Sequence, residues 1–371
     1  MDDFQNYKTL EQTMMIQAAS TNEPISGSIE LLPLCNMNCD MCYVRLSRKE
    51  MESLGRMRTG KEWVDLGKEM AEAGTLFLLL TGGEPLLHPN FQEIYLGLRK
   101  LGMILTINTN ATLIDEKWAD FFQQYKPRRI NITLYGADNQ AYETLCHYPG
   151  GFDKVIHAVN LLKKRDIDVR LSGSATLQNV QDITSTYKIA EELNVPMATD
   201  VYMNPSIRER NKPFNKQSRL LPEEAAAAHL LKLRLEKGEE YFSAYKRTAL
   251  DTIDNHVPGK KTACSSSCMA GRCSFTINWQ GYMRPCVLSS EPTVPVFELG
   301  FKESWKQMTK GFSEIQYCSE CSVCPRKALC RICPVAALAE TGDYMKKPEY
   351  LCRYTKEIER LLRIPEEEDH E

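Results

Sequence analysis

The sequence predicts an α/β protein in which a parallel sheet with helical crossovers is followed by a cysteine-rich second domain. Between residues 28 and 202, six short apolar runs alternate with longer amphipathic segments. Such alternation with short connections is typical of a parallel sheet with right-handed crossovers. Six strands are too few for a complete eight-stranded barrel. Both an open sheet and an incomplete barrel therefore fit the pattern.

The individual elements follow from the apolar runs and their spacing. The predicted strands occupy residues 28–34, 75–80, 103–108, 129–134, 168–173 and 196–202, and the predicted helices occupy residues 61–73, 90–101, 114–125, 153–165 and 182–194. Residues 203–221 are polar and basic with two prolines, which predicts a linker or a surface loop. Residues 222–241 open with a proline and two acidic residues, which suits a helix N-terminus.

These patterns divide the chain into five parts. We expect an N-terminal segment, a sheet-forming domain, a linker with a bridging helix, a cysteine-rich domain and an acidic tail without regular structure, at residues 1–27, 28–202, 203–262, 263–360 and 361–371.

The composition of the 371 residues indicates a cytoplasmic protein that binds metal. The net charge of −3 gives no sign of a nucleic-acid or membrane-binding surface. No apolar run is long enough to span a membrane, and the first residues do not resemble an export signal. In such a chain, 14 cysteines indicate metal ligands rather than disulfides. Cys146 stands alone in the sequence and is expected to be a plain buried thiol.

Three cysteines in one loop follow the first predicted strand, at positions 35, 39 and 42. A structural zinc site needs four protein ligands, so a zinc knuckle would require a distant fourth ligand. A [4Fe–4S] cluster held by three cysteines leaves one iron open for a substrate or cofactor. The loop lies at the carboxyl end of the sheet, where α/β enzymes place their chemistry.

The spacing CX3CX2C of these cysteines resembles the signature of the radical S-adenosylmethionine (SAM) superfamily. The resemblance implies that Cys35, Cys39 and Cys42 bind three irons and that the amino and carboxylate groups of SAM bind the fourth. Electron transfer into SAM then releases methionine and a 5′-deoxyadenosyl radical. The residue before the third cysteine is usually aromatic in the family. This chain has Met41 there, and Tyr43, just after the cysteine, is an expected cofactor contact.

Three further strand ends carry family-like residues. Gly82-Gly83-Glu84-Pro85 is similar to the GGEP motif, which holds the SAM amino group, although a turn and a helix start would explain it in isolation. The third strand ends at Asn108-Thr109-Asn110, and the fourth ends at Thr133-Leu134-Tyr135-Gly136, where many relatives have Ser-x-Asp-Gly. The resemblance thus implies SAM contacts by Gly82, Gly83, Glu84, Asn110 and Thr133.

The cysteine-rich region resembles the SPASM domain, which follows the barrel in radical SAM enzymes that act on peptides and proteins. The resemblance implies two auxiliary [4Fe–4S] clusters, each with four cysteine ligands. The first would use Cys268, Cys273, Cys286 and Cys333, and the second Cys321, Cys324, Cys330 and Cys352. Either Cys264 or Cys268 suits the first position, and Cys318 is left over. A pair of zinc ribbons is the competing interpretation.

Taken together, the resemblance implies an incomplete (β/α)6 TIM-like barrel followed by a small loop-rich α+β SPASM domain, with SAM and three [4Fe–4S] clusters as cofactors. The implied reaction is hydrogen abstraction from a peptide, forming a thioether or carbon–carbon crosslink in a ribosomally made peptide. The enzymatic alternatives are formylglycine formation in sulfatases and oxidation of a small molecule or haem precursor. A non-catalytic iron–sulfur carrier is the alternative of another class, but it needs neither an open iron nor a GGEP stretch.

The expected partners follow from this chemistry. They are a peptide or protein substrate and an electron donor such as flavodoxin or ferredoxin, with no nucleic acid and no membrane. The 27 residues before the first strand are too few for a leader-peptide recognition domain. A peptide substrate would therefore need that domain on a separate protein, or would bind the barrel edge directly. The sequence identifies no catalytic acid or base.

Overall fold

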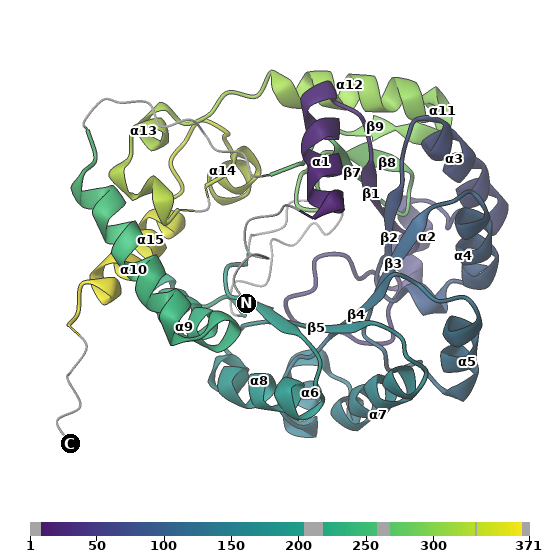
Figure 1. Ribbon diagram of the computed structural model, residues 1–371. Coiled ribbons are helices and arrows are strands. Elements are labelled where there is room, and N and C mark those ends of the chain that lie inside the picture. Colours follow the sequence, from purple (N-terminus) through teal and green to yellow (C-terminus); the bar gives the residue numbers. More distant parts are fainter. Residues whose placement is uncertain (1–8, 204–217, 258–267, 331, 366–371) are drawn as a thin grey trace.

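The computed structural model describes residues 9–203, 218–257, 268–330 and 332–365. The strands of this part form one nine-stranded sheet with the order β6-β5-β4-β3-β2-β1-β7-β8-β9. Figure 1 shows the sheet curving around a central space, with α3, α4, α5 and α7 on its outer side. The predicted α/β class and the incomplete barrel are confirmed.

The first six strands form the barrel part of the sheet, where each of β1 to β5 pairs in parallel with the next strand along the chain. In β2 and β4, buried positions alternate with partly exposed ones. Alternate side chains of a strand point to opposite faces, so one set packs under the helices and the other faces the barrel interior. These strands are Ser26–Glu30 (β1), Phe77–Thr81 (β2), Ile104–Thr109 (β3), Arg129–Thr133 (β4), Val169–Ser174 (β5) and Met197–Asp200 (β6).

Helices connect these strands and cover the outer face. In α3, a capping box between Thr59 and Glu62 satisfies the first backbone N–H groups, and Trp63, Leu66 and Met70 then form the buried stripe. The sequence pattern did not predict α2 and α6, which are short. The helices of this part are Arg48–Leu54 (α2), Gly60–Glu72 (α3), Pro85–Leu87 (η1), Phe91–Lys100 (α4), Glu116–Gln124 (α5), Asn139–Cys146 (α6), Gly151–Lys164 (α7), Val180–Asp182 (η2) and Ile183–Glu192 (α8).

The first part of the cysteine-rich region extends the barrel sheet. Ser274–Ile277 (β7) pairs in parallel with β1, and Tyr282–Arg284 (β8) and Val294–Pro295 (β9) continue the sheet in antiparallel fashion. The helices Val296–Leu299 (α11) and Phe301–Ser313 (α12) follow, and α12 contacts α3. The expected boundary at residue 263 is therefore not a boundary of the sheet. The long-range pairing of β7 with β1 leaves no local sign in the sequence.

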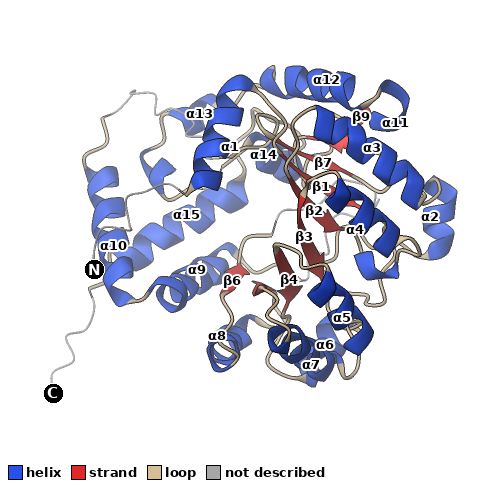
Figure 2. Ribbon diagram, turned by 45° about the vertical axis from the view of Figure 1, so that its right-hand side comes forward, coloured by secondary structure: helices blue, strands red, loops and turns tan. Residues whose placement is uncertain are grey.

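A second hydrophobic core lies beside the barrel and is built mainly on two helices. Small residues of α9, among them Ala225 and Ala226, allow close packing against Leu351 and Ile358 of α15. The expected single helix at 222–241 is two helices, because Gly238 interrupts it with a φ of 81°. The helices of this region (Figure 2) are Pro222–Lys237 (α9), Glu239–Asp254 (α10), Ser319–Ser322 (α13), Pro325–Ala328 (η3), Pro334–Thr341 (α14) and Glu349–Leu362 (α15).

Both predicted terminal segments contain helical structure. Leu10–Thr21 (α1) lies within the expected N-terminal segment, and α15 extends into the expected acidic tail. The rest of that tail from residue 366, residues 204–217 and 258–262 of the expected linker segment, and Cys264 fall outside the described residues. No helix of the described part is long and apolar enough to cross a membrane.

The open edge of the sheet at β6 is covered by side chains of α9. The Lys232 ammonium donates to the backbone oxygen of Thr199 at 2.6 Å, and Glu236 accepts from the backbone N–H of Thr199 at 3.1 Å. The hydroxyl of Tyr187 also donates to Glu236. An exposed strand edge is prone to pairing with another chain. Here the Lys232–Glu236 pair, 3.6 Å apart, takes the place of a neighbouring strand.

Replacing Glu236 by Ala should loosen this edge. The amide of Thr199 loses its acceptor, at a cost of about 1–3 kcal/mol for a buried donor. Hydrogen–deuterium exchange of the peptide that contains β6 should become faster. Lys237→Ala changes an exposed residue of the same helix and should leave this exchange unchanged. Equal exchange in all three proteins would show that the edge does not depend on Glu236.

Candidate active site

The carboxyl ends of the barrel strands surround a cavity of about 330 Å³. Residues that follow β1 through β6 contribute to its wall, as expected for a parallel α/β enzyme. Leu288, which follows β8 in the cysteine-rich region, also contributes. The lining residues are Cys35, Met37, Cys39, Met41, Cys42, Tyr43, Val44, Thr81, Gly82, Gly83, Asn108, Thr109, Asn110, Thr133, Tyr135, Ser174, Asp200, Tyr202, Met203 and Leu288.

The loop with the three cysteines is anchored by the end of α6. The backbone N–H groups of Asn38 and Asp40 donate to the carbonyls of Cys146 and Leu145, both at 3.0 Å. The ring of His147 contacts the Asp40 carboxylate at 2.8 Å. These carbonyls belong to the last turn of α6, where a helix has no internal donors for them. The helix end therefore fixes the loop over the cavity.

The cysteine sulfurs are arranged as acceptors. Cys35 accepts from the backbone N–H of Met37 at 3.4 Å and from the Asn110 amide at 3.6 Å, and Cys42 accepts from the N–H of Arg45 at 3.3 Å. Burial raises the pKa of Cys35 to about 12. A buried thiolate therefore requires a positive partner, and a bound metal supplies one. Three thiols that line one cavity, two of which accept N–H bonds, fit the ligand set of an iron–sulfur cluster.

The two glycines after β2 allow a close backbone contact with the segment after β1. The N–H of Gly83 donates to the carbonyl of Leu32 at 2.7 Å. A Cβ at Gly83 would lie 2.3 Å from the carbonyl oxygen of Leu34, and one at Gly82 would lie 2.5 Å from that of Leu32. Larger residues are therefore excluded at both positions. Both glycines line the cavity, so the close approach also brings their backbone to the place expected for SAM.

Glu84 is fully buried and is not among the residues that line the cavity. Its carboxylate accepts from the Thr109 hydroxyl at 2.8 Å, from the backbone N–H of Asn110 at 2.8 Å and from that of Leu86 at 3.1 Å. The side chain thus ties the end of β2 to the end of β3. Contact between Glu84 and SAM stays a prediction, and the structure gives the residue a role in the protein interior that the motif did not suggest.

The other expected SAM contacts come from three different segments that line the cavity. Tyr43 follows the cysteine loop, Asn110 follows β3 and Thr133 ends β4. The Asn110 side chain donates to Asn36 at 2.9 Å as well as to Cys35. Asn110 therefore connects the end of β3 with the cysteine loop.

Four of the expected auxiliary ligands line a second cavity, of about 320 Å³. Cys321 lies in α13, Cys324 and Cys330 flank η3, and Cys352 lies in the first turn of α15. Four thiols around one space fit the donor set of a [4Fe–4S] cluster. Cys318 is buried and forms a hydrogen bond with Cys321, but it does not line this cavity.

The other set of expected auxiliary ligands also comes together. Cys268 and Cys333 both act electrostatically on Cys286, and Cys268 acts on Cys273. Burial is the main cause that raises the pKa of Cys286, to about 11. Leu288 of the first cavity is only two residues from Cys286. Of this cysteine set, Cys286 is therefore close in sequence to the wall of the active-site cavity.

Comparison with known proteins decides the family. Residues 29–190 match the model of the Radical SAM superfamily. The protein contains a radical SAM domain. The matched segment contains the cysteine loop, the end of β1, and β2 through β5. Members of this family bind SAM and a [4Fe–4S] cluster.

Two curated relatives of this radical SAM enzyme carry names of different kinds. The AdoMet-dependent heme synthase of Methanosarcina barkeri is 24% identical over 91% of this chain and 98% of the relative. The antilisterial bacteriocin subtilosin biosynthesis protein AlbA of Bacillus subtilis is also 24% identical, over 92% of this chain and 74% of the relative.

A solved structure supports the fold over most of the chain. Streptococcus suis SuiB bound to the precursor peptide SuiA has a TM-score of 0.66 and 17% identity, over 95% of this chain and 84% of SuiB. At this identity the likeness concerns the fold.

Several residues of the radical SAM site were not predicted from the sequence. Tyr135 lines the cavity and forms a hydrogen bond with Cys39. A hydrogen bond with Cys146 and burial raise the pKa of Cys39, and the bond with Tyr135 acts in the opposite direction. Ser174 and Asp200 end β5 and β6, and this position at the carboxyl end of predicted strands was the available signal. Leu288 had no comparable signal.

Tyr202 is fixed in the cavity wall by distant parts of the radical SAM enzyme. Its hydroxyl donates to Glu340 of α14 at 2.9 Å. Arg219 forms a buried ion pair with Glu340 and lies over the ring of Tyr350, 3.4 Å from its centroid. The C-terminal helices therefore help to shape the active-site cavity.

The protonation of Glu84 can be measured directly. Desolvation raises the pKa of Glu84 from 4.5 to about 7. Because the folded-state value is higher, the contribution of this group to stability is full below pH 4.5 and is lost as the pH rises through about 7. In pH-difference infrared spectra, a buried carboxyl band should titrate near pH 7 and be absent from Glu84→Gln. A midpoint at or below the ordinary value of 4.5 would contradict this.

Proposed function

We propose that this radical SAM enzyme modifies a ribosomally made peptide, by forming a thioether or carbon–carbon crosslink. The observation that carries the proposal is the active-site cavity, where Cys35, Cys39 and Cys42 meet the glycines after β2. Two relatives favour a peptide substrate, since AlbA is named for the biosynthesis of a bacteriocin and SuiB is bound to a precursor peptide.

The proposed cofactors are SAM and three [4Fe–4S] clusters. Cys35, Cys39 and Cys42 would hold the first, and the two auxiliary clusters would use the two four-cysteine sets. When bound, SAM and the first cluster supply the 5′-deoxyadenosyl radical, and the auxiliary clusters supply electron acceptance. The proposed SAM contacts are Tyr43, Gly82, Gly83, Glu84, Asn110 and Thr133. A separate leader-recognition protein and an electron donor are proposed partners, and 14 thiols suit the reducing cytoplasm.

The protein itself positions the substrate and keeps water out. Met37 and Met41 of the cysteine loop are buried, with exposed fractions of 2% and 7%. Tyr202, Met203 and Leu288 form a largely apolar part of the cavity wall. An apolar wall suits a hydrophobic peptide side chain and excludes solvent from a reactive intermediate.

Oxidation of a haem precursor is the second candidate, favoured by the likeness to the haem synthase of Methanosarcina barkeri. Such substrates carry several carboxylates, which bind best to Arg or Lys. Among the described residues that line the cavity, none is Lys, Arg or His, and the one charged side chain is Asp200. This charge distribution favours the peptide over the porphyrin.

The metal content tests the proposed clusters. Anaerobically reconstituted protein should hold about twelve irons per chain, and the triple variant Cys35→Ala, Cys39→Ala, Cys42→Ala about eight. Cys146→Ala is a matched control, because Cys146 contacts Cys39 but is not a proposed ligand, and it should retain all the iron. Zinc in place of iron, or no loss in the triple variant, would refute the assignment.

The substrate is tested by mass spectrometry. The enzyme is incubated anaerobically with SAM, dithionite and either a precursor peptide encoded beside it or an iron porphyrin with propionate side chains. Each crosslink removes a pair of hydrogens from the peptide, so a corresponding mass loss is expected with the peptide alone. Turnover of the porphyrin with an unchanged peptide would favour the second candidate instead.

A further inference from the structure

The cavity proposed for the second auxiliary cluster is rimmed by cationic side chains. Arg326 and Lys327 come from η3, Lys347 precedes α15 and Lys356 lies within it. The carboxylates that line the same cavity are Glu320 and Glu349. The rim therefore carries four cations and two anions, on a chain whose net charge is −3.

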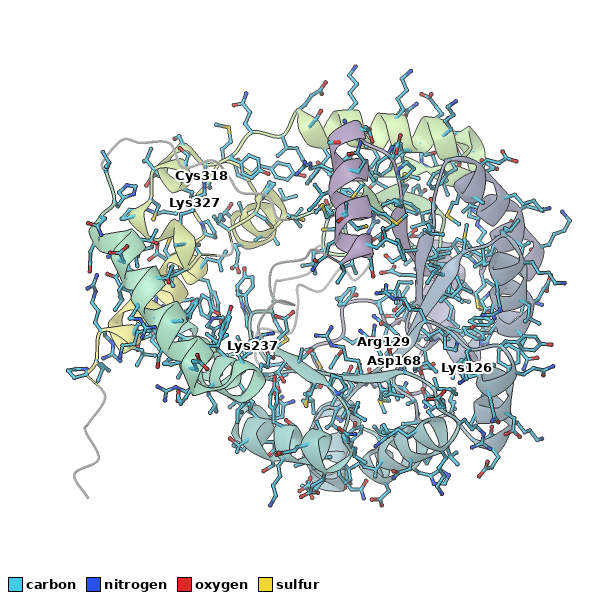
Figure 3. The ribbon with its side chains drawn as sticks, in the orientation of Figure 1. Lys126, Arg129, Asp168, Lys237, Cys318 and Lys327 are labelled. Atoms are coloured by element: carbon cyan, nitrogen blue, oxygen red, sulfur yellow. The ribbon has the colours of Figure 1, made fainter. Side chains whose placement is uncertain are left out.

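Two of these cations form ion pairs with nearby carboxylates. Arg326 pairs with Glu359 at 2.5 Å, and Lys347 pairs with Glu320 at 3.0 Å. Lys347 and Lys356 are exposed, and Lys327 is half-buried. We call Lys327, Lys347 and Lys356 the lysine rim. Figure 3 labels Lys327 and Cys318 in the region built by the C-terminal helices, and Lys237 in another part of the molecule.

The lysine rim and the four cysteines of the second set line the same cavity. Lys347, Lys356 and Cys352 all line this cavity, so the cations lie around the proposed ligands. The lining of the active-site cavity differs, because its one charged side chain is Asp200. Positive charge is thus concentrated at the cavity of the second cysteine set and is missing from the described lining of the substrate cavity.

We propose that the lysine rim is the docking surface of a small acidic electron-carrier protein, which exchanges one electron with the second auxiliary cluster. The inference rests on the proposed cluster assignment. In the exchange the carrier loses one electron and the cluster gains it, or the reverse, and no bond forms or breaks. An excess of positive charge around an electron-transfer site guides an acidic partner to it and makes association dependent on salt. A peptide substrate has no reason to bind here, because its reacting carbon must reach the other cavity.

The test uses anaerobically reconstituted full-length protein and a reduced plant-type [2Fe–2S] ferredoxin as the acidic carrier. Affinity is measured with fluorescently labelled ferredoxin at several salt concentrations, and electron transfer is followed by stopped-flow absorbance. The double variant Lys347→Glu, Lys356→Glu should weaken association by about tenfold or more at low salt and flatten its salt dependence. Dithionite-driven SAM cleavage at the first cluster should stay unchanged.

Lys237→Glu is the matched control, since Lys237 is an exposed lysine of a second cationic cavity, at the base of the barrel, together with Arg129, Arg170 and Lys188. It should leave ferredoxin binding unchanged. Loss of binding in this variant with normal binding in the double variant would overturn the proposal, as would wild-type affinity in both.

A structural role of the lysines gives a different result. If they only balance the charge of the cluster, the double variant should lose iron or slow the reduction of the cluster by dithionite, while its ferredoxin affinity stays normal, and the proposal is wrong. Failure of the proposed cluster itself is separate, because wild-type protein would then hold about eight irons instead of about twelve.

Discussion

The active site depends on the backbone contact between the segment after β1 and the glycines after β2. The N–H groups of Gly83 and Glu84 donate to the carbonyls of Leu32 and Leu34 at 2.7 and 2.9 Å. These bonds continue the pairing of the two strands beyond their ends, and the cysteine loop begins immediately afterwards. Only glycine fits at this contact, since a Cβ at Gly83 would overlap a carbonyl oxygen. The Glu84 carboxylate in turn accepts from the backbone N–H of Asn110 after β3, and the Asn110 side chain donates to the sulfur of Cys35.

The incomplete barrel creates a second constraint, because both edges of its sheet need a partner. The edge at β1 receives β7, and the edge at β6 receives Lys232 and Glu236 of α9. Both solutions use residues that follow the barrel in the chain. The cysteine-rich region is therefore part of the barrel's structure, and it also contributes Leu288 to the cavity wall. This arrangement brings the expected auxiliary cysteines and the active site into one framework.

Local patterns were sufficient to predict the barrel strands and the helices between them. A buried parallel strand is a short continuous apolar run, and each crossover helix shows its buried stripe, as Trp63, Leu66 and Met70 do in α3. The pairing of β7 with β1 could not be predicted, because it depends on residues almost 250 positions apart, such as Ser26 and Ser274. The same holds for Cys146, whose contact with Cys39 arises only when α6 packs against the loop.

Motifs indicated which residues gather at the site, and the structure shows what each one touches. The GGEP stretch led to the expectation that Glu84 faces the cofactor, yet three protein donors already occupy its carboxylate. A motif records that a residue type is needed at a position, and the need can come from the fold as well as from the ligand. At Gly82 and Gly83 the backbone contact excludes a side chain, and both glycines also line the cavity proposed for SAM. At Glu84 the described contacts are those of the fold, which holds the strand ends in place so that the neighbouring groups can meet a ligand.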